Sequence, residues 1–258
     1  RAIPLTPHDI NNKTRHIGNH KEDFVFVSLL KSCAKNKDFY KGIRVHDEIV
    51  KKGLLTKSSY IASALIHMYV KCGMVTKAHQ VHDELPDRDI VCWSALIGGY
   101  VQQGQSSEAL KCFEEMLEEG LCPNEFTFIS ILKACGSLKA SGRGEQVHHE
   151  IVIQGLMDRS VALCNALVDM YAKCGLLSKA QKVLDDLQVR NVVSWNALIT
   201  GYAQYDLDHE VFESYASMLK DSMSPDEVTY SCLLKACGSI GAVNMGRQIH
   251  NELIGRGL

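Results

Sequence analysis

The sequence is poor in proline and tryptophan, with five and 2 residues of these types in a chain of 258. No apolar run approaches the roughly 18 residues of a membrane span, so we expect no membrane segment. Neither sign of charge dominates, because the formal net charge is −2. A protein that binds nucleic acid through phosphates alone needs a basic surface. Any recognition of nucleic acid by this chain must therefore depend on contacts to the bases.

The ten cysteines include no C-x-x-C pair, the spacing typical of zinc sites and redox centres. We therefore expect reduced, partly buried thiols, no metal and no cofactor. The P-loop, G-x-S-x-G and G-x-G-x-x-G arrangements are also missing. These absences predict that the chain is not an enzyme and takes no small-molecule substrate.

One enzymatic motif, the H-x-E of zinc-dependent nucleotide deaminases, occurs four times within residues 23–258. The histidines concerned are His46, His82, His148 and His250. They recur at similar places in a repeating pattern, and no C-x-x-C completes a metal site. The motif is therefore interpreted as part of the repeat.

The repeat is the main feature of the sequence. DFVFVSLLKSC at 23 returns as EFTFISILKAC at 125 and as EVTYSCLLKAC at 227, a shift of 102 residues each time. The same shift relates Trp93 to Trp195 and Pro123 to Pro225. Each period divides into three related segments, which gives 23–58, 59–89, 90–124, 125–160, 161–191, 192–226 and a final 227–258.

Each segment is predicted to be a helical hairpin. In 90–124, Trp93, Leu96, Ile97, Tyr100 and Val101 are spaced to lie on one helical face. A second apolar stripe follows Gly104 and ends before Gly120, a predicted C-cap. One such hairpin cannot bury two apolar stripes alone, so neighbours must stack. The sequence predicts an all-α solenoid of seven helix-turn-helix repeats and about fourteen helices, with these apolar residues as core.

Residues 1–22 precede the repeats. They contain Asp9 and Glu22 and have no apolar core, so they match neither a signal peptide nor a transit peptide. We interpret them as leader or linker sequence.

Two families of helical hairpin have about this length. The tetratricopeptide pattern W-x2-L-G is missing. Instead, 90–124 and 192–226, with their terminal Pro-Asn and Pro-Asp, closely resemble the pentatricopeptide repeat (PPR). NALVDMYAKCG at 165 is similar to the family's S-type repeat and FISILKACGS at 128 to its L-type. The order L, S, P over 23–258 resembles the PLS subclass of plant organellar RNA-editing factors, and the resemblance implies a right-handed superhelix.

The resemblance implies that each repeat reads one RNA base with the fifth residue of its first helix and the last residue of the repeat. In the S and P repeats these pairs are Ser63 with Asp89, Ser94 with Asn124, Asn165 with Asn191, and Asn196 with Asp226. A short Ser leaves room for a purine, and Asn reaches a pyrimidine. Asp accepts from the imino N–H of G or U, whereas Asn can donate to A or C. The predicted target is 5′-N-G-A-N-(C/U)-U-N-3′.

The L repeats place Val27 and Ile129 at the fifth position, with Ser58 and Ser160 last, and are expected to read nothing, or only the shape of a base. By resemblance, the second residue of each repeat stacks on bases, namely Phe24, Tyr60, Val91, Phe126, Ala162, Val193 and Val228. Lys71 and Lys173 are candidates for phosphate contact, and Lys31, Lys133 and Lys235 form a second recurring register.

The resemblance also implies the chain's partners and location. Single-stranded RNA is the expected partner, and the uncoded L repeats are expected to receive multiple-organellar-editing-factor proteins. The expected location is the chloroplast or the mitochondrion. The alternative is a protein-binding scaffold. Helical-repeat arrays that bind proteins have the same architecture as those that bind RNA, and a fold does not determine function.

Overall fold

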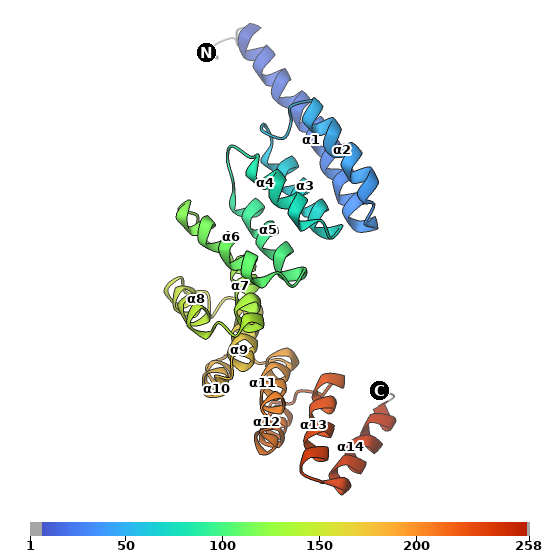
Figure 1. The fold of residues 1–258 in the computed structure, drawn as a ribbon, viewed down its shortest axis with the longest axis vertical. Helices are drawn as coiled ribbons and strands as arrows, with labels where there is room; N and C mark the ends of the chain where they lie inside the picture. The colour runs from blue at the N-terminus through green and yellow to red at the C-terminus, as the bar shows by residue number, and fades with distance from the viewer. Residues whose placement is uncertain (1–6, 257–258) are drawn as a thin grey trace, which may run out of the picture. The chain divides into compact units, whose positions relative to one another are not determined.

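The computed structural model describes residues 7–256, and side chains over 22–255. This part of the chain contains fourteen α-helices and no strand, as the repeat pattern predicted (Figure 1). The helices are α1 Pro7–Asn36, α2 Phe39–Lys51, α3 Ser59–Lys71, α4 Val75–Asp83, α5 Ile90–Gln102, α6 Ser106–Glu118, α7 Glu125–Leu138, α8 Ser141–Ile153, α9 Val161–Lys173, α10 Leu177–Asp185, α11 Val192–Gln204, α12 Asp208–Lys220, α13 Glu227–Ser239 and α14 Val243–Arg256. None of them has the length and apolar character of a membrane span.

The ends of the chain bear on two predicted boundaries. Helix α1 begins at Pro7, so part of the predicted leader 1–22 is helical, and residues 1–6 lie outside the described part. The final residues of the last repeat, 257–258, lie outside it as well.

The chain divides into two compact units, residues 1–124 and 125–258. The division falls at a predicted repeat boundary, between a P and an L repeat. Within the first unit α3 packs against α1 and α5, and within the second α9 packs against α7 and α11. Each second helix packs on the first helix of its own hairpin. Consecutive first helices therefore form a continuous layer in each unit.

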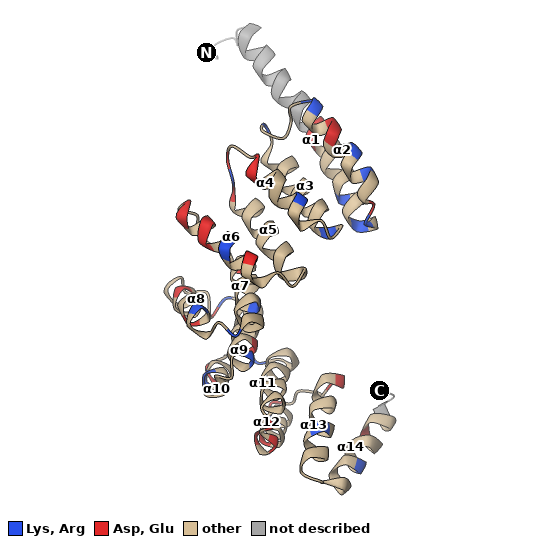
Figure 2. Cartoon of the chain, viewed as in Figure 1, with Lys and Arg blue, Asp and Glu red and all other residues tan. Residues whose placement is uncertain are grey.

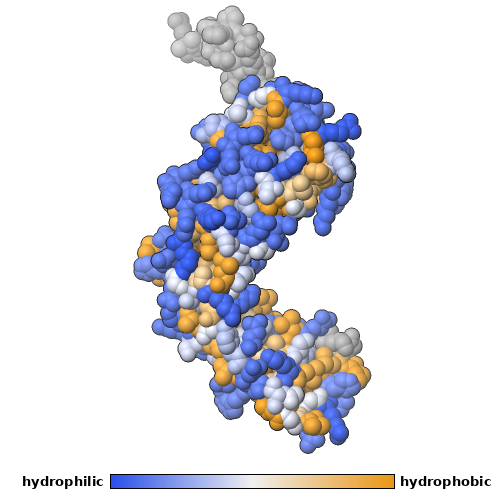
Figure 3. All heavy atoms as spheres, in the orientation of Figure 1, coloured by the Kyte–Doolittle hydropathy of each residue, from blue (hydrophilic) through white to orange (hydrophobic). Residues whose placement is uncertain are grey.

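The predicted apolar stripes form the core of each unit. In the first unit Trp93 is 1% exposed and Leu96 and Ile97 are fully buried. In the second unit Leu198 and Ile199 are likewise fully buried, and Trp195 is 3% exposed. Apolar side chains on the visible surface form only small patches among polar ones (Figure 3). The prediction that this face is core is confirmed for Trp93, Leu96, Ile97 and Tyr100, whereas Val101 is only half-buried.

The last residue of five repeats is the N-cap residue of the next first helix, and all of them except Ser58 accept a backbone N–H of that helix through their side chain. Ser58, Asp89, Ser160, Asn191 and Asp226 are the N-cap residues of α3, α5, α9, α11 and α13. The Asp89 carboxylate accepts from the backbone N–H groups of Val91 and Cys92 at 3.0 and 2.9 Å. Such side chains satisfy N–H groups that a helix leaves unpaired at its start.

Glycine turns close the hairpins where the sequence predicted them. Gly104 and Gly120 adopt φ of 72° and 77°, a left-handed conformation that costs glycine nothing. Gly120 lies one residue beyond the C-cap of α6, as the predicted end of that helix requires.

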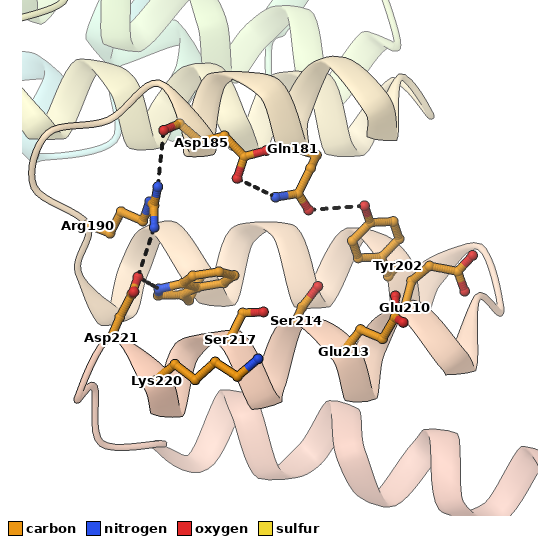
Figure 4. Close-up of a pocket in the computed structure, with 11 residues that line it drawn as sticks. Gln181, Asp185, Arg190, Tyr202, Glu210, Glu213, Ser214, Ser217, Lys220 and Asp221 are labelled. Carbon is orange, nitrogen blue, oxygen red and sulfur yellow. Dashed lines mark hydrogen bonds and ion pairs between the residues drawn. The ribbon is translucent and has the colours of Figure 1, made fainter.

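An arginine joins each S repeat to the following P repeat. The Arg190 guanidinium donates to the carbonyl oxygens of Leu184 and Asp185 at the end of α10 and to Asp221 beyond α12 at 3.2 Å (Figure 4). Asp221 also accepts from the Trp195 indole N–H at 3.2 Å. In the first unit Arg88, Glu119 and Trp93 make the same arrangement, with Arg88 2.8 Å from Glu119. This Arg clamp joins three helices of two repeats.

Histidine–tyrosine hydrogen bonds join other neighbouring repeats. His46 Nδ1 lies 2.8 Å from the Tyr69 hydroxyl, and His148 Nδ1 lies 2.8 Å from that of Tyr171. Burial lowers the pKa of both histidines. His46 and His148 are two of the four H-x-E histidines within the repeats, and both take part in packing between repeats.

The ten cysteines are all free thiols, and Cys122 alone among them is exposed. The expected partial burial of the thiols is confirmed, with six buried and three half-buried.

Candidate nucleic-acid interface

A groove of about 420 Å³ runs across the first helices α7, α9, α11 and α13 of the second unit. Its lining includes residues at the predicted base-reading and stacking positions: Ile129, Ala162, Asn165, Val193, Asn196 and Val228. Lys133, Asp169 and Thr200 line it one helical turn farther along. Because all the lining helices are the first of their hairpins, the residues recur at one register along the groove.

One predicted reading pair is joined directly. The Asn196 side-chain amide donates to both carboxylate oxygens of Asp226, at 2.8 and 2.9 Å. The Thr229 hydroxyl, itself fully buried, donates to Asn196 Oδ1 at 2.6 Å. Asn196 is 8% exposed, so these contacts fix which way its amide points.

The Asp226 carboxylate is held as an anion. Burial raises its pKa, but the backbone N–H of Thr229, the Asn196 amide, the Thr229 hydroxyl and the backbone N–H of Val228 together hold it below its ordinary value. The same carboxylate caps α13 in a capping box. Asp226 is thus a fixed acceptor at neutral pH.

The pair Asn165 and Asn191 is joined more loosely. Asn165 Nδ2 donates to Asn191 Oδ1 at 3.3 Å, and the same oxygen accepts from the backbone N–H of Ser194 at 2.9 Å. The Asn165 Oδ1 atom is buried and has no hydrogen-bond partner within the described residues. A buried acceptor without a partner is costly, so this pair is held less firmly than Asn196 and Asp226.

The two predicted pairs of the first unit contain serine. The Ser63 hydroxyl donates to the backbone carbonyl of Tyr60 at 3.2 Å, and Asp89 caps α5. Ser94 is 5% exposed and Asn124 is half-buried. Short side chains at the fifth position leave more room above the helix than Asn196 does.

The L repeats use their last residue differently. Ser58 donates to the Asp23 carboxylate at 2.8 Å, and Ser160 donates to Glu125 at 2.5 Å. Both acids are the first residue of the same repeat. The last residue in these repeats therefore contacts an acid of its own repeat and not the fifth residue, Val27 or Ile129, which carries no hydrogen-bonding group.

The predicted stacking residues are all exposed despite their apolar character. Phe24 and Tyr60 are each 75% exposed, and the smallest of the seven, Ala162, is exposed as well. Exposed aromatic side chains at a fixed register provide faces on which bases can stack. Three of the seven are aromatic, and the stacking role of the set stays a prediction.

The charged residues of the two units are mixed in sign along the helices (Figure 2). Lys173 is paired with Asp169 at 2.8 Å, and Lys235 with Asp206 at 3.0 Å. Lys71 is exposed, and together with Lys31 it adds to burial in lowering the pKa of His67. Among the recurring lysines, Lys71, Lys31 and the groove residue Lys133 have no ion-pair partner within the described residues.

Two features of the interface were missed from the sequence. Thr229 belongs to the repeat that follows the repeat of Asn196. The predicted pattern pairs the fifth and last residues of one repeat, so it could not include this contact between two repeats. The acids Asp23 and Glu125 were missed as well, although an acidic residue at the start of each L repeat distinguishes it from the S and P repeats.

Family models match the chain in the register of these hairpins. A model described as PPR repeat matches residues 24–54, 60–90, 162–192 and 228–258. A model described as PPR repeat family matches residues 88–137 and 190–239.

Curated proteins of Arabidopsis thaliana match over almost the whole chain. A mitochondrial pentatricopeptide repeat-containing protein is 38% identical over 240 residues, which are 93% of this chain and 23% of that protein. A chloroplastic one is 36% identical over 239 residues, 92% of this chain and 44% of that protein. The chain thus spans less than half the length of these relatives.

Solved structures agree in fold. The pentatricopeptide repeat protein PPR10 from maize superimposes with a TM-score of 0.69 at 20% identity, over 89% of this chain and 33% of that one. PPR10 has also been solved in complex with an 18-nt psaJ RNA element, and that structure matches with the same TM-score. The predicted helical-repeat solenoid is therefore confirmed. With repeat models matching most of its length, the chain belongs to the pentatricopeptide repeat family.

Proposed function

We propose that this chain binds single-stranded RNA along its first helices and reads one base with each S and P repeat. The observation that carries the proposal is the joined pair Asn196 and Asp226, of which Asn196 lines a groove together with other residues at the second and fifth positions of the repeats. PPR10, which shares the fold, has been solved with RNA. The proposed target is 5′-N-G-A-N-(C/U)-U-N-3′, read from the N-terminal to the C-terminal repeat.

The chemistry of the second P repeat favours uracil. An ionised Asp226 accepts hydrogen bonds and donates none, which suits the imino N–H of U or G. The Asn196 side chain fills space that a purine ring would need. The pair therefore selects the smaller ring with an imino donor.

The second S repeat suits cytosine, with U as the alternative. Asn191 can donate from its amide to the acceptor nitrogen of C, and Asn165 lines the groove beside it. Because both residues are amides, each can donate and accept, and this pair discriminates least. The serine pairs of the first unit are proposed to read G with Asp89 and A with Asn124.

We further propose that the chain is a recognition module of the PLS subclass for C-to-U editing in a plant organelle. The repeat lengths of 36, 31 and 35 residues support this assignment, and curated relatives carry mitochondrial or chloroplastic names. The L repeats are free for a protein partner such as an organellar editing factor, because Ser58 and Ser160 bond within their own repeats. Editing itself is assigned to other parts of a larger assembly.

Base preference tests the proposal directly. The chain should bind the target oligonucleotide more tightly than a scramble of the same composition, measured by fluorescence anisotropy. Replacing Asn196 with Thr should move the preference at that position from U toward G, because Thr is shorter and leaves room for a purine. One mismatched base should cost about 1–3 kcal/mol.

Two outcomes would count against base reading. Equal affinity for the target and its scramble would contradict it. An unchanged preference after Asn196→Thr would favour the protein-binding scaffold instead. As a matched control, Ile129→Val lies at the fifth position of an L repeat and should leave base preference unchanged.

A further inference from the structure

Three side chains with metal-binding atoms meet between α4 and α6 of the first unit, away from the first-helix groove. A ring nitrogen of His79, the Cys112 Sγ and a carboxylate oxygen of Glu115 all lie within 4.8 Å of one another. His79 is half-buried, Cys112 is buried and Glu115 is exposed. The sequence search missed this group because its members come from two repeats and have no C-x-x-C spacing.

The helices present these atoms in a way that suits an ion. Cys112 and Glu115 are three residues apart on α6, and His79 and Asp83 are four apart on α4, so each pair shares one helical face. His79 Nδ1 is hydrogen-bonded to the Tyr100 hydroxyl, and its Nε2 lies 3.5 Å from Asp83 Oδ1. Whichever nitrogen binds the ion, the other keeps a polar neighbour that orients the ring, as metal-binding histidines typically have.

The charges around the thiol also suit a cation. Burial, followed by the nearby carboxylates of Glu115, Glu108 and Asp83, raises the pKa of Cys112 to about 12. A divalent ion neutralises these carboxylates and favours the thiolate, so binding releases the Cys112 proton. Zinc bonds to N, O and S of about 2.0–2.3 Å place tetrahedral ligand atoms roughly 3.5 Å apart. The ligand atoms must therefore approach one another by about 1 Å, and the exposed Glu115 side chain can move by that amount.

We propose that His79, Cys112 and Glu115, with Asp83 or water as a fourth ligand, bind a divalent transition-metal ion of the Zn²⁺ class and so join an S repeat to the next P repeat. Mixed nitrogen, sulfur and oxygen ligands favour zinc over calcium or magnesium, which prefer oxygen alone.

The second period of the repeat is a natural comparison. At a shift of 102 residues the three ligands become Gln181, Ser214 and Ser217. These three line a cavity of about 360 Å³ between α10, α11 and α12 (Figure 4). The surrounding residues keep their types, since Asp185, Arg190, Trp195 and Tyr202 correspond to Asp83, Arg88, Trp93 and Tyr100. The two periods therefore differ at the ligand positions within a shared framework.

Metal titration of the untagged full chain tests the site. We expect one Zn²⁺ per chain, and with Co²⁺ a thiolate charge-transfer band in the near ultraviolet. Cys112→Ser, His79→Gln and Glu115→Ser each introduce the residue that the second period tolerates, so the fold should survive, and circular dichroism can verify this. Loss of a residue that only hydrogen-bonds to a metal ligand typically weakens metal binding about 10- to 100-fold. Each of these variants removes a ligand itself and should weaken binding by more than that.

The control variant is Cys122→Ser, which removes the exposed thiol and should leave the Co²⁺ band unchanged. A wild-type chain that gives no thiolate band would overturn the proposal, as would a band that persists at full strength after Cys112→Ser.

A graft gives an independent test. Combining Gln181→His, Ser214→Cys and Ser217→Glu should create a second site, so the stoichiometry should rise from one ion to two. Restoring Ser214 in the graft, with the other two substitutions kept, should abolish the added site. An unchanged stoichiometry in a folded graft would contradict the assignment of these three positions as ligands. RNA affinity does not enter this test, so its result is separable from that of the proposed function.

Discussion

At the scale of single residues, the amide of Asn196 is held at both ends, by the Asp226 carboxylate and by the Thr229 hydroxyl. A base approaching this position meets groups that are already oriented, which reduces the cost of ordering them on binding. Thr229 makes no proposed contact with RNA, and its part is to set the direction in which Asn196 and Asp226 present donors and acceptors.

Replacing Thr229 with Val should weaken discrimination at the base read by Asn196. The change keeps the shape but leaves Asn196 Oδ1 buried without a donor, so we also expect a loss of stability of about 1–3 kcal/mol. The measurement is the ratio of affinities for U and C at that position. Thr229→Ser keeps the hydroxyl and should retain the ratio, and a Val variant with the wild-type ratio would show that the hydroxyl does not orient the pair.

His82 is a second residue with an unusual environment. It is fully buried, its ring centroid lies 4.1 Å from that of Trp93, and neither ring nitrogen has a hydrogen-bond partner within the described residues. Burial, with Arg88 as the next cause, lowers its pKa to about 4. The unfolded chain therefore binds more protons than the folded chain between about pH 6.5 and this value.

It follows that acidification from pH 7 toward pH 4.5 should destabilise the first unit. Because Leu184 occupies the equivalent position of the second period and is also fully buried, His82→Leu should fit. It should stabilise by about 1–3 kcal/mol, by removing two unsatisfied nitrogens, and should flatten the pH dependence. Urea unfolding at both pH values measures this. A leucine variant with the same pH dependence as wild type would assign the effect to other groups.

At the scale of helices, the Arg clamps show how neighbouring hairpins are joined without disulfides. Arg190 satisfies carbonyl groups left open at the end of α10 and at the same time bonds to Asp221. Its fork of donors serves three acceptors, which a lysine ammonium at the same distance does not reproduce. The clamp is about one-third exposed, so its ion pair is partly screened by solvent.

Arg190→Lys should therefore loosen the joint between α10 and α12, and amide hydrogen exchange should speed up at the end of α10. The expected cost is about 1–2 kcal/mol, mostly from the lost carbonyl contacts. Lys111→Met removes an exposed ion pair within α6 and should leave exchange unchanged. Equal exchange in wild type and Arg190→Lys would show that the clamp adds nothing to the joint.

Much of the helical architecture was predictable, because the apolar spacing of residues such as Trp93, Leu96 and Ile97 repeats with the chain and fixes a buried face. The proposed reading positions rest on family resemblance alone and stay a prediction. The contacts of Thr229, the Arg clamps and the His79 cluster were not, since each joins side chains of two repeats. Periodicity assigns faces to helices, but the pairing of polar side chains depends on rotamers and distances.

At the scale of the whole chain, a net charge of −2 constrains how RNA affinity can depend on salt. Lys173 and Lys235 are already paired, which leaves Lys71, Lys31 and Lys133 as the recurring lysines for phosphate. With about −0.7 per phosphate on single strands, two or three contacts give a slope of about −1.4 to −2.1 in log K against log salt. Anisotropy titrations across salt measure it, and a slope near −6 would require phosphate contacts that these lysines cannot supply.

The capping role of the last residue sets a limit on redesign of this array. Asp89, Asn191 and Asp226 each cap the helix that follows with their side chain, so the residue that completes one proposed reading unit also starts the next hairpin. Ser, Asn, Asp and Thr are the side chains suited to the N-cap. The need to cap the next helix therefore restricts which residues can occupy the last position of a repeat, independently of RNA. Replacing one of these capping residues with alanine would cost about 0.5–2 kcal/mol of helix stability, in addition to any lost contact with a base. Exchanges among the capping residues are the ones that can rewrite specificity while keeping the neighbouring repeat intact.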